Sequence, residues 1–107
     1  MYTITVKGVF SAAHALQGRP GPCSRLHGHT WVVEAELAST GLDKDGMVLD
    51  FDMAAEALKE AIAPFDHQCL NEVEPFDSIP PTAENVARVI YQRMLGAAES
   101  GGWGPRP

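Results

Sequence analysis

The chain has 107 residues, 45% of them hydrophobic and 21% charged, a composition that fits one small globular domain and excludes a disordered chain. A formal net charge of −6 argues against general nucleic-acid binding. No apolar run approaches the roughly 20 residues of a bilayer-spanning helix, so we expect no membrane partner. A strand pattern begins at once, with no signal-peptide pattern before it. The two cysteines are therefore expected to be free thiols in the cytoplasm.

Two stretches predict β-strands that pair as a hairpin. In residues 2–10 and 29–38 apolar side chains occupy every second position, the period of a strand with one wet face. The apolar positions are Tyr2, Ile4 and Val6 in the first stretch and Trp31, Val33, Ala35 and Leu37 in the second. Antiparallel pairing would place the end of the first strand beside the start of the second.

Three histidines lie at that shared end: His14 follows the first strand, and His27 and His29 lie at the start of the second. Because strand side chains repeat every two residues, His27 and His29 project the same way if the second strand begins early enough. Three neutral imidazoles with an open fourth position are typical of catalytic zinc sites. The alternative is that all three are ordinary polar surface residues.

The connection between the strands, residues 15–26, contains Gly18, Pro20, Gly21 and Pro22 and predicts a loop. Cys23 lies near its end, two residues before Arg25 and four before the first histidine of the pair. A nearby guanidinium and a nearby metal would both favour the thiolate, which acts as nucleophile or base. The alternative is an inert, partly buried thiol.

Two helices are predicted in the second half of the chain. The first begins at Asp52 as its cap and runs to about residue 63, where Pro64 stops it, after a short extended piece at 47–51. Its inner positions are Ala54, Leu58, Ala61 and Ile62. The second helix has Thr82 as its cap and runs to about residue 98. Its inner positions are Val86, Val89, Ile90 and Met94.

Asp66 and His67 form the second stretch with chemical potential. A carboxylate beside a histidine can orient the imidazole and stabilise its charge. Adjacent side chains diverge on a helix or strand, so this pairing requires irregular backbone. The alternative is a chance loop. We expect Cys69, two residues on, to serve packing.

Five short motifs follow one another along the chain. They are Phe10-Ser11-Ala12-Ala13-His14, Cys23-x-Arg25-Leu26-His27-Gly28-His29, Leu49-Asp50-Phe51, Asp66-His67-x-x-Leu70-Asn71 and Pro81-Thr82-x-Glu84-Asn85. As a set they resemble the 6-pyruvoyltetrahydropterin synthase/6-carboxytetrahydropterin synthase family, over residues 1 to about 98. The short spacing between Cys23 and His27 is similar to that of the bacterial carboxy branch, which feeds queuosine and other 7-deazapurines.

The resemblance implies an α+β T-fold for the single domain 1–107: an antiparallel sheet with two helices on one face. It also implies that His14, His27 and His29 hold Zn²⁺. Cys23 would be the catalytic base, and Asp66 and His67 would complete the proton-transfer set. Thr82, Asp50 and Phe51 would lie by the pterin pocket, and Arg25 is a candidate phosphate contact in an otherwise acidic chain.

The implied reaction is a zinc-dependent lyase step on 7,8-dihydroneopterin triphosphate that forms 6-carboxy-5,6,7,8-tetrahydropterin and releases acetaldehyde and triphosphate. The alternatives are 6-pyruvoyltetrahydropterin synthase activity, a zinc- and pterin-binding homologue without turnover, and a plain metal-dependent hydrolase. The family also implies a homohexamer of two stacked trimers, in which hairpins from several chains join into a barrel.

The sequence departs from the family after the second helix. The resemblance implies two further strands, the first with a glutamate that anchors the pterin ring, and this sequence stops before them. Either the sequence is shortened relative to the gene product, or a neighbouring chain covers the sheet.

Overall fold

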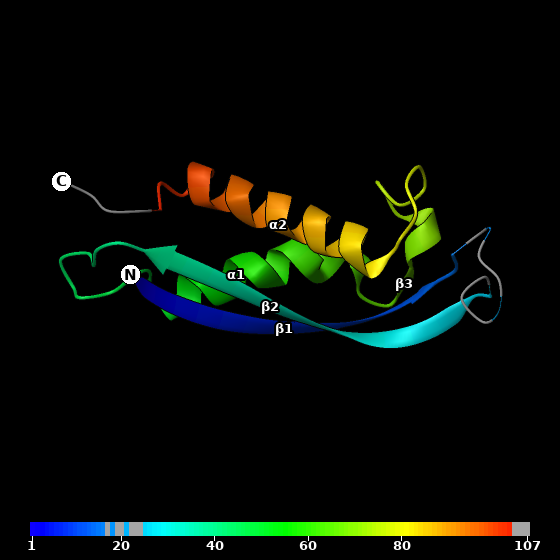
Figure 1. The fold of residues 1–107 in the computed structure, drawn as a ribbon, viewed down its shortest axis with the longest axis horizontal. Coiled ribbons are helices and arrows are strands. Elements are labelled where there is room, and N and C mark those ends of the chain that lie inside the picture. The colour runs from blue at the N-terminus through cyan, green and yellow to red at the C-terminus, as the bar shows by residue number, and fades with distance from the viewer. Residues whose placement is uncertain (17, 19–20, 22–24, 104–107) are drawn as a thin grey trace.

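A long two-stranded hairpin carries two helices above it in the computed structural model, which describes residues 1–16, 18, 21 and 25–103 (Figure 1). In chain order the described elements are two long strands, a helix, a 3₁₀ turn, a two-residue strand, a second 3₁₀ turn and a final helix. The predicted α+β class is confirmed.

The hairpin pairs β1, Tyr2–His14, with β2, His27–Ser39, in antiparallel register. Both strands extend beyond the predicted ranges and include the three histidines. On the face toward the helices, Phe10 is 1% exposed and stacks on Trp31, with the ring centroids 5.6 Å apart. Residues of the other face, such as Val9 and Val32, are exposed. The alternation read from the sequence therefore decides which face is covered.

Helix α1, Phe51–Ile62, packs against β1. Its cap is Asp50, whose side chain accepts a hydrogen bond from the backbone of Asp52, so the prediction of Asp52 as the cap was wrong by two residues. The extended piece predicted at 47–51 is also wrong, because these residues form bends and then the first helical residue. The predicted inner positions are confirmed as buried: Ala54, Leu58, Ala61 and Ile62.

After α1 the chain forms a 3₁₀ turn, Ala63–Phe65, which contains Pro64 as predicted at the helix end. A short strand β3, Gln68–Cys69, then pairs in parallel with β1, and the sheet order is β2-β1-β3. A second 3₁₀ turn, Leu70–Glu72, follows. The sequence predicted no strand here, and the antiparallel hairpin is thereby extended into a small mixed sheet.

Helix α2, Ala83–Ser100, lies along α1 and ends at the same end of the molecule as the start of β1 (Figure 1). Thr82 is its cap, as predicted, and accepts a hydrogen bond from the backbone N–H of Asn85 at 3.1 Å. Arg93 ties α2 to its neighbour, donating to the carbonyl of Ala61 at 3.2 Å. No helix in the described ranges has both the length and the apolar character to cross a bilayer.

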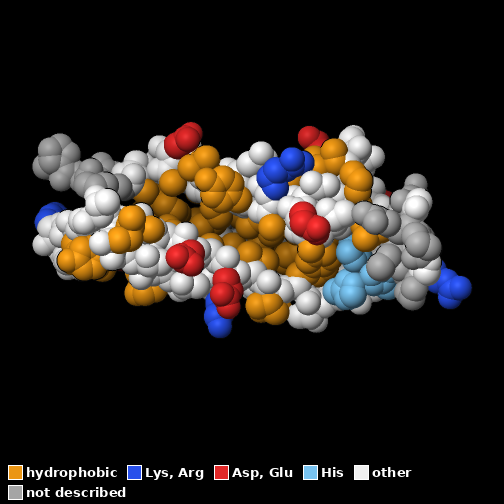
Figure 2. Space-filling model, in the orientation of Figure 1, with side chains coloured by type: hydrophobic (Ala, Val, Ile, Leu, Met, Phe, Trp, Pro, Cys, Tyr) orange, Lys and Arg blue, Asp and Glu red, His pale blue; other side chains and the backbone are white. Residues whose placement is uncertain are grey.

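A groove of about 680 Å³ separates β2 from α2. Apolar side chains floor it in Figure 2. They include Val33, Ala35 and Leu37 from the strand and Ile90, Tyr91, Met94 and Leu95 from the helix. Among the described residues, β2 pairs only with β1, so its other edge is open along the groove. The core is consequently better covered over β1 than over β2.

Candidate metal centre

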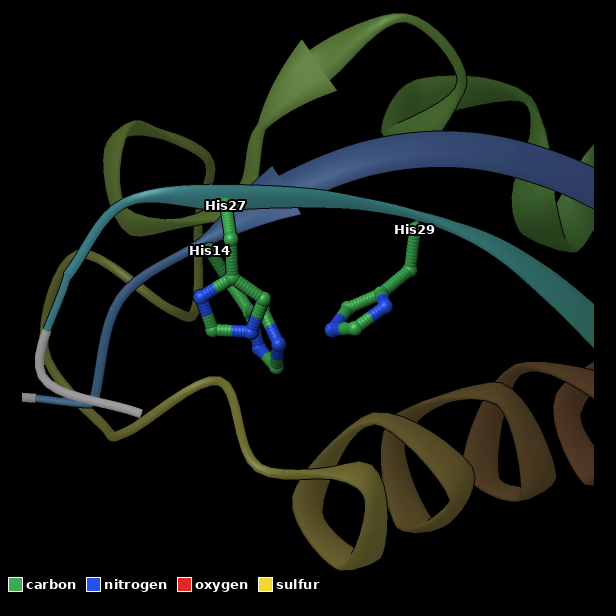
Figure 3. A group of neighbouring side chains, drawn as sticks. All are labelled: His14, His27 and His29. Carbon is green, nitrogen blue, oxygen red and sulfur yellow. The ribbon is translucent and has the colours of Figure 1, made fainter. Parts of the chain in front are cut away.

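The end of the hairpin gathers His14, His27 and His29 on one face. His14 is paired directly with His27, and Ala12 with His29, so the alternation of both strands turns the three rings the same way. Figure 3 shows the imidazoles converging below the strands, beside the start of α2. One potential ligand atom from each ring lies within 4.8 Å of the other two. The predicted convergence of the three side chains is confirmed.

Backbone carbonyls orient two of these rings. Nδ1 of His14 lies 2.7 Å from the carbonyl oxygen of Pro81, and Nδ1 of His27 lies 2.6 Å from that of Arg25. A carbonyl only accepts, so Nδ1 carries a proton in both rings, and in the neutral form of each ring the lone pair is on Nε2. Metal-binding histidines are commonly held in this way, through the ring nitrogen that does not face the metal.

Burial distinguishes His14 from its partners. It is 6% exposed, whereas His27 is half-buried and His29 is exposed. Burial lowers the pKa of His14, and the neighbouring histidines lower it further, against the hydrogen bond to Pro81. A lowered pKa keeps the imidazole neutral near pH 7, and the neutral ring is the form that coordinates a metal.

The donor set fits the predicted zinc ion. Zinc is commonly bound by imidazole nitrogens, and catalytic sites use three protein ligands and leave one position open. Two of the three rings already carry the Nδ1 proton that leaves Nε2 available, and the third is close enough to join them. The three histidines could therefore hold a metal ion.

The side chains of Asp66 and His67 are paired, with Asp66 Oδ1 and His67 Nδ1 3.0 Å apart. The same Oδ1 accepts the backbone N–H of Ser11 at 3.0 Å, and the His67 N–H donates to the Ser11 carbonyl at 2.6 Å. The Ser11 bond, then the bond and charge of His67, lower the pKa of Asp66. His67 has φ 59°, so the pairing depends on left-handed, irregular backbone as predicted.

This pair lies apart from the three histidine rings within one chain. His67 lines a hollow with Ser11, Thr30 and Cys69, and the start of β2, including His29, also borders it. The side chains of Ser11 and Thr30 belong to the hairpin face opposite the histidine rings, because both are one residue out of phase with Ala12 and His29. The hollow at His67 therefore opens mainly on the face opposite the histidine rings and reaches their cluster only at His29.

The remaining predicted site residues are spread along the molecule. Thr82 follows Pro81 and so lies next to His14, and Arg25 lies exposed just before β2. Asp50 and Phe51 start α1 at the far end of the hairpin from the histidines (Figure 1). Cys23, the predicted base, lies outside the described residues.

The sequence did not reveal the two carbonyls that orient the histidine rings. The Pro81 carbonyl is 67 residues from His14 along the chain, and every residue has a carbonyl, so no residue type marks it. The predicted start of α2 near residue 81 was the one available signal, because it brings a turn of backbone to this end of the hairpin.

The fold and the site together define an α+β protein with a cluster of three histidines, able to hold a metal ion, at the end of a hairpin. Comparison with known proteins is more specific. The model of the family "6-pyruvoyl tetrahydropterin synthase" matches residues 3–103, and the chain belongs to this family of enzymes.

Several relatives are similar over most of this chain. A protein of Archaeoglobus fulgidus is 36% identical over 91 residues, which cover 85% of this chain and 74% of that protein. A Bacillus subtilis protein named 6-carboxy-5,6,7,8-tetrahydropterin synthase is 37% identical over 90 residues, covering 78% of this chain and 59% of its own length. The synthase of the same name from Haemophilus influenzae is 33% identical over 120 residues, which cover 88% of this chain and 82% of that protein.

A solved structure supports the same placement. The structure of Caenorhabditis elegans 6-pyruvoyl tetrahydropterin synthase is similar with a TM-score of 0.66 and 28% sequence identity, over 91% of this chain and 80% of that one. The T-fold expected from the sequence motifs is thereby confirmed.

Proposed function

We propose that this protein is a zinc-dependent lyase that converts 7,8-dihydroneopterin triphosphate to 6-carboxy-5,6,7,8-tetrahydropterin, with release of acetaldehyde and triphosphate. Such a step would serve the synthesis of queuosine and other 7-deazapurines. Family membership and the names of the bacterial relatives support a tetrahydropterin synthase. The observation that carries the zinc requirement is the convergence of His14, His27 and His29, with two rings already fixed for coordination through Nε2.

The three histidines would hold Zn²⁺, which when bound supplies a Lewis acid for the oxygens of the substrate side chain. The chain's own contribution is to orient two ligands and to keep His14 neutral. Burial keeps His14 neutral, and the carbonyls of Pro81 and Arg25 orient His14 and His27.

Proton transfer would use Cys23, Asp66 and His67. As a thiolate, Cys23 would remove a carbon-bound proton of the substrate side chain, a role that rests on the family resemblance. His67 would return a proton at another position. Asp66 holds Nδ1 of His67 at 3.0 Å, which leaves Nε2 as the nitrogen that exchanges protons. The His67 side chain is 81% exposed, so a substrate or a second chain can reach it.

Substrate contacts would come from Thr82 and Arg25 near the histidines and from Asp50 and Phe51 of another chain. The exposed guanidinium of Arg25 is a candidate for the triphosphate, because arginine binds phosphate oxygens through paired hydrogen bonds. Phe51 is 56% exposed at the far end of the hairpin, so it can contact a neighbouring molecule.

We further propose assembly into a homohexamer of two stacked trimers, with active sites between chains. Two placements support shared sites: α1 begins far from the histidines (Figure 1), and the hollow at His67 opens mainly beside Ser11 and Thr30 on the opposite face of the hairpin. Sedimentation velocity at micromolar concentration tests the assembly. A well-folded monomer would contradict both the hexamer and the shared site. A cytoplasmic location remains a prediction from the sequence.

A second product deserves a direct test. The family model and the similar solved structure carry the name of 6-pyruvoyl tetrahydropterin synthase, which favours a pyruvoyl product as the alternative. The bacterial relatives with the carboxy name are 33–37% identical, against 28% for the solved pyruvoyl enzyme, and this difference favours the carboxy product.

The deciding experiment is mass analysis of products from zinc-loaded protein and 7,8-dihydroneopterin triphosphate, with acetaldehyde assayed in parallel. A carboxypterin with acetaldehyde supports the proposal, and a pyruvoylpterin without acetaldehyde supports the alternative. Cys23→Ala should abolish turnover, while Cys69→Ala, the matched control, should retain it. A rate unchanged in Cys23→Ala would indicate a hydrolase, and no turnover in the unmutated protein would indicate a binding module.

A further inference from the structure

We infer that Asn71 and Asn85 are positioning residues of the metal centre, which hold His14 in place from two sides. The inference rests on the proposed function, since it concerns the histidine that would bind zinc. These two residues are the only asparagines in the chain. The Asn71 side chain binds the backbone of Ala15, the residue after His14. The Asn85 side chain binds the carbonyl of Pro80, next to the Pro81 carbonyl that lies against the His14 ring.

Asn71 holds the backbone immediately after His14. Its Oδ1 accepts the N–H of Ala15 at 2.9 Å, and its Nδ2 donates to the carbonyl of Ala15 at 2.9 Å. One amide side chain thus satisfies both backbone groups of Ala15, as a neighbouring strand would. Asn71 is itself held by the 3₁₀ turn that begins at Leu70, which is 0% exposed. The last residue of β1 is therefore tied to the core at the point where the strand ends.

Asn85 holds the segment that accepts the proton of the His14 ring. Its Nδ2 donates to the carbonyl of Pro80 at 2.9 Å, next to the Pro81 carbonyl that lies 2.7 Å from Nδ1 of His14. Its backbone N–H donates to Oγ1 of Thr82, so the same residue also serves the helix cap. The direction of the Pro81 carbonyl, and with it the rotation of the His14 ring, depends on this turn.

The effect on metal binding follows from the burial of His14. His29 is exposed and can adjust to an ion, and His27 is held only by a local bond to Arg25, whereas His14 is 6% exposed and is held within the core. A ligand that is held in the productive orientation before binding loses less conformational freedom when the ion arrives. Residues that orient metal ligands typically contribute about 10–100-fold in affinity.

The test measures Zn²⁺ affinity by competition with a chromophoric chelator and records visible absorption of the Co²⁺-loaded protein. Asn71→Ala and Asn85→Ala should each weaken Zn²⁺ binding by about 10-fold or more and shift the Co²⁺ bands. Asn71→Asp keeps an acceptor for the Ala15 N–H but no donor for its carbonyl, so it should recover part of the affinity. Asn85→Ala leaves the backbone bond to Thr82 intact, so it isolates the bond to Pro80.

Ser39→Ala is the matched control. Ser39 also makes two side-chain bonds to one residue, donating to the Gly41 carbonyl at 2.7 Å and accepting its N–H at 3.3 Å, at the opposite end of β2. This variant should lose stability without losing Zn²⁺ affinity.

The outcomes separate this inference from the proposed function. If the unmutated protein binds neither ion, the metal centre itself is refuted. If it binds both ions and the asparagine variants match its affinity and Co²⁺ spectrum, the positioning role is refuted. If Ser39→Ala weakens binding as much as they do, the effect is one of general stability and the inference also fails.

Discussion

Replacing His14 by alanine should destabilise the protein even when no metal is bound. His14 is 6% exposed, and its Nδ1 donates to the Pro81 carbonyl at 2.7 Å. Removal of the ring leaves that buried carbonyl without its partner, at a cost of about 1–3 kcal/mol. It also removes the ring contact with Trp31, whose centroid lies 4.9 Å away. We expect the free energy of unfolding of the chelated protein to fall by about 2 kcal/mol, which lowers Tm by roughly 8–16 °C in a domain of this size.

His29→Ala provides the matched comparison, because His29 is exposed. In the chelated protein it should change stability by no more than about 0.5 kcal/mol. Zinc should stabilise the unmutated protein by about 2.7 kcal/mol when the free ion is at 100 times Kd. Both variants should lose most of that gain, since each lacks one of the three ligands.

Thermal unfolding followed by circular dichroism, with chelator or with buffered zinc, measures the stability of all three proteins with and without the ion. The reasoning is refuted if His29→Ala destabilises the chelated protein as much as His14→Ala. It is equally refuted if zinc stabilises either variant as much as it stabilises the unmutated protein.

Three further predictions concern other parts of the molecule. The pKa of Asp66 is lowered in the folded state, so Asp66 adds stability above pH 3.8 that is lost as pH falls through the lowered pKa. Its carboxyl carbon should titrate by NMR below 3.8, and His67→Ala should leave part of the shift, because the backbone bond from Ser11 is the largest single cause. A midpoint at or above 3.8 would contradict this. Gly8→Val should lower the free energy of unfolding in urea by about 1–3 kcal/mol. A Cβ at this position would lie 3.0 Å from the Ile62 side chain and 3.2 Å from the Leu58 side chain, both on α1. No loss of stability would show that α1 can move away. Asp50→Ala should cost about 1 kcal/mol in the same assay, since it removes the cap of α1, and an unchanged midpoint would show that the bond to Asp52 is not needed.

The convergence of the histidines was predictable because it depends on local rules. The two-residue period of a strand places His27 and His29 on one face, and antiparallel pairing brings the end of β1 to the start of β2. The cap of α1 was mispredicted because Asp50 and Asp52 are the same residue type, and only the backbone path shows which one accepts the bond.

Features that depend on distant residues were not predictable. Strand β3 is two residues long and has no period of its own, so it exists only because the edge of β1 is available to it. The bonds of Asn71 to Ala15 span 56 residues of sequence, and nothing in the residue types announces them. The hydrogen bonds that hold His14 in place depend on distant residues and were not predictable. The position of His14 at the end of the hairpin depends on local pattern and was predictable.

The edge of β2 that is unpaired within the described residues limits which molecules can associate with this protein. Glu34 and Glu36 project from the exposed face of that strand, and Lys7 lies 3.5 Å from the first of them. Two copies of β2 paired about a twofold axis at Ala35 would place Glu34 of each opposite Glu36 of the other, and like charges directly opposite destabilise a strand pair. Such a dimer would close after two subunits. A different strand, without carboxylates at the facing positions, would meet no such repulsion. A contact between β2 and a different strand of the next subunit is head-to-tail, and such contacts can continue from subunit to subunit until a ring closes.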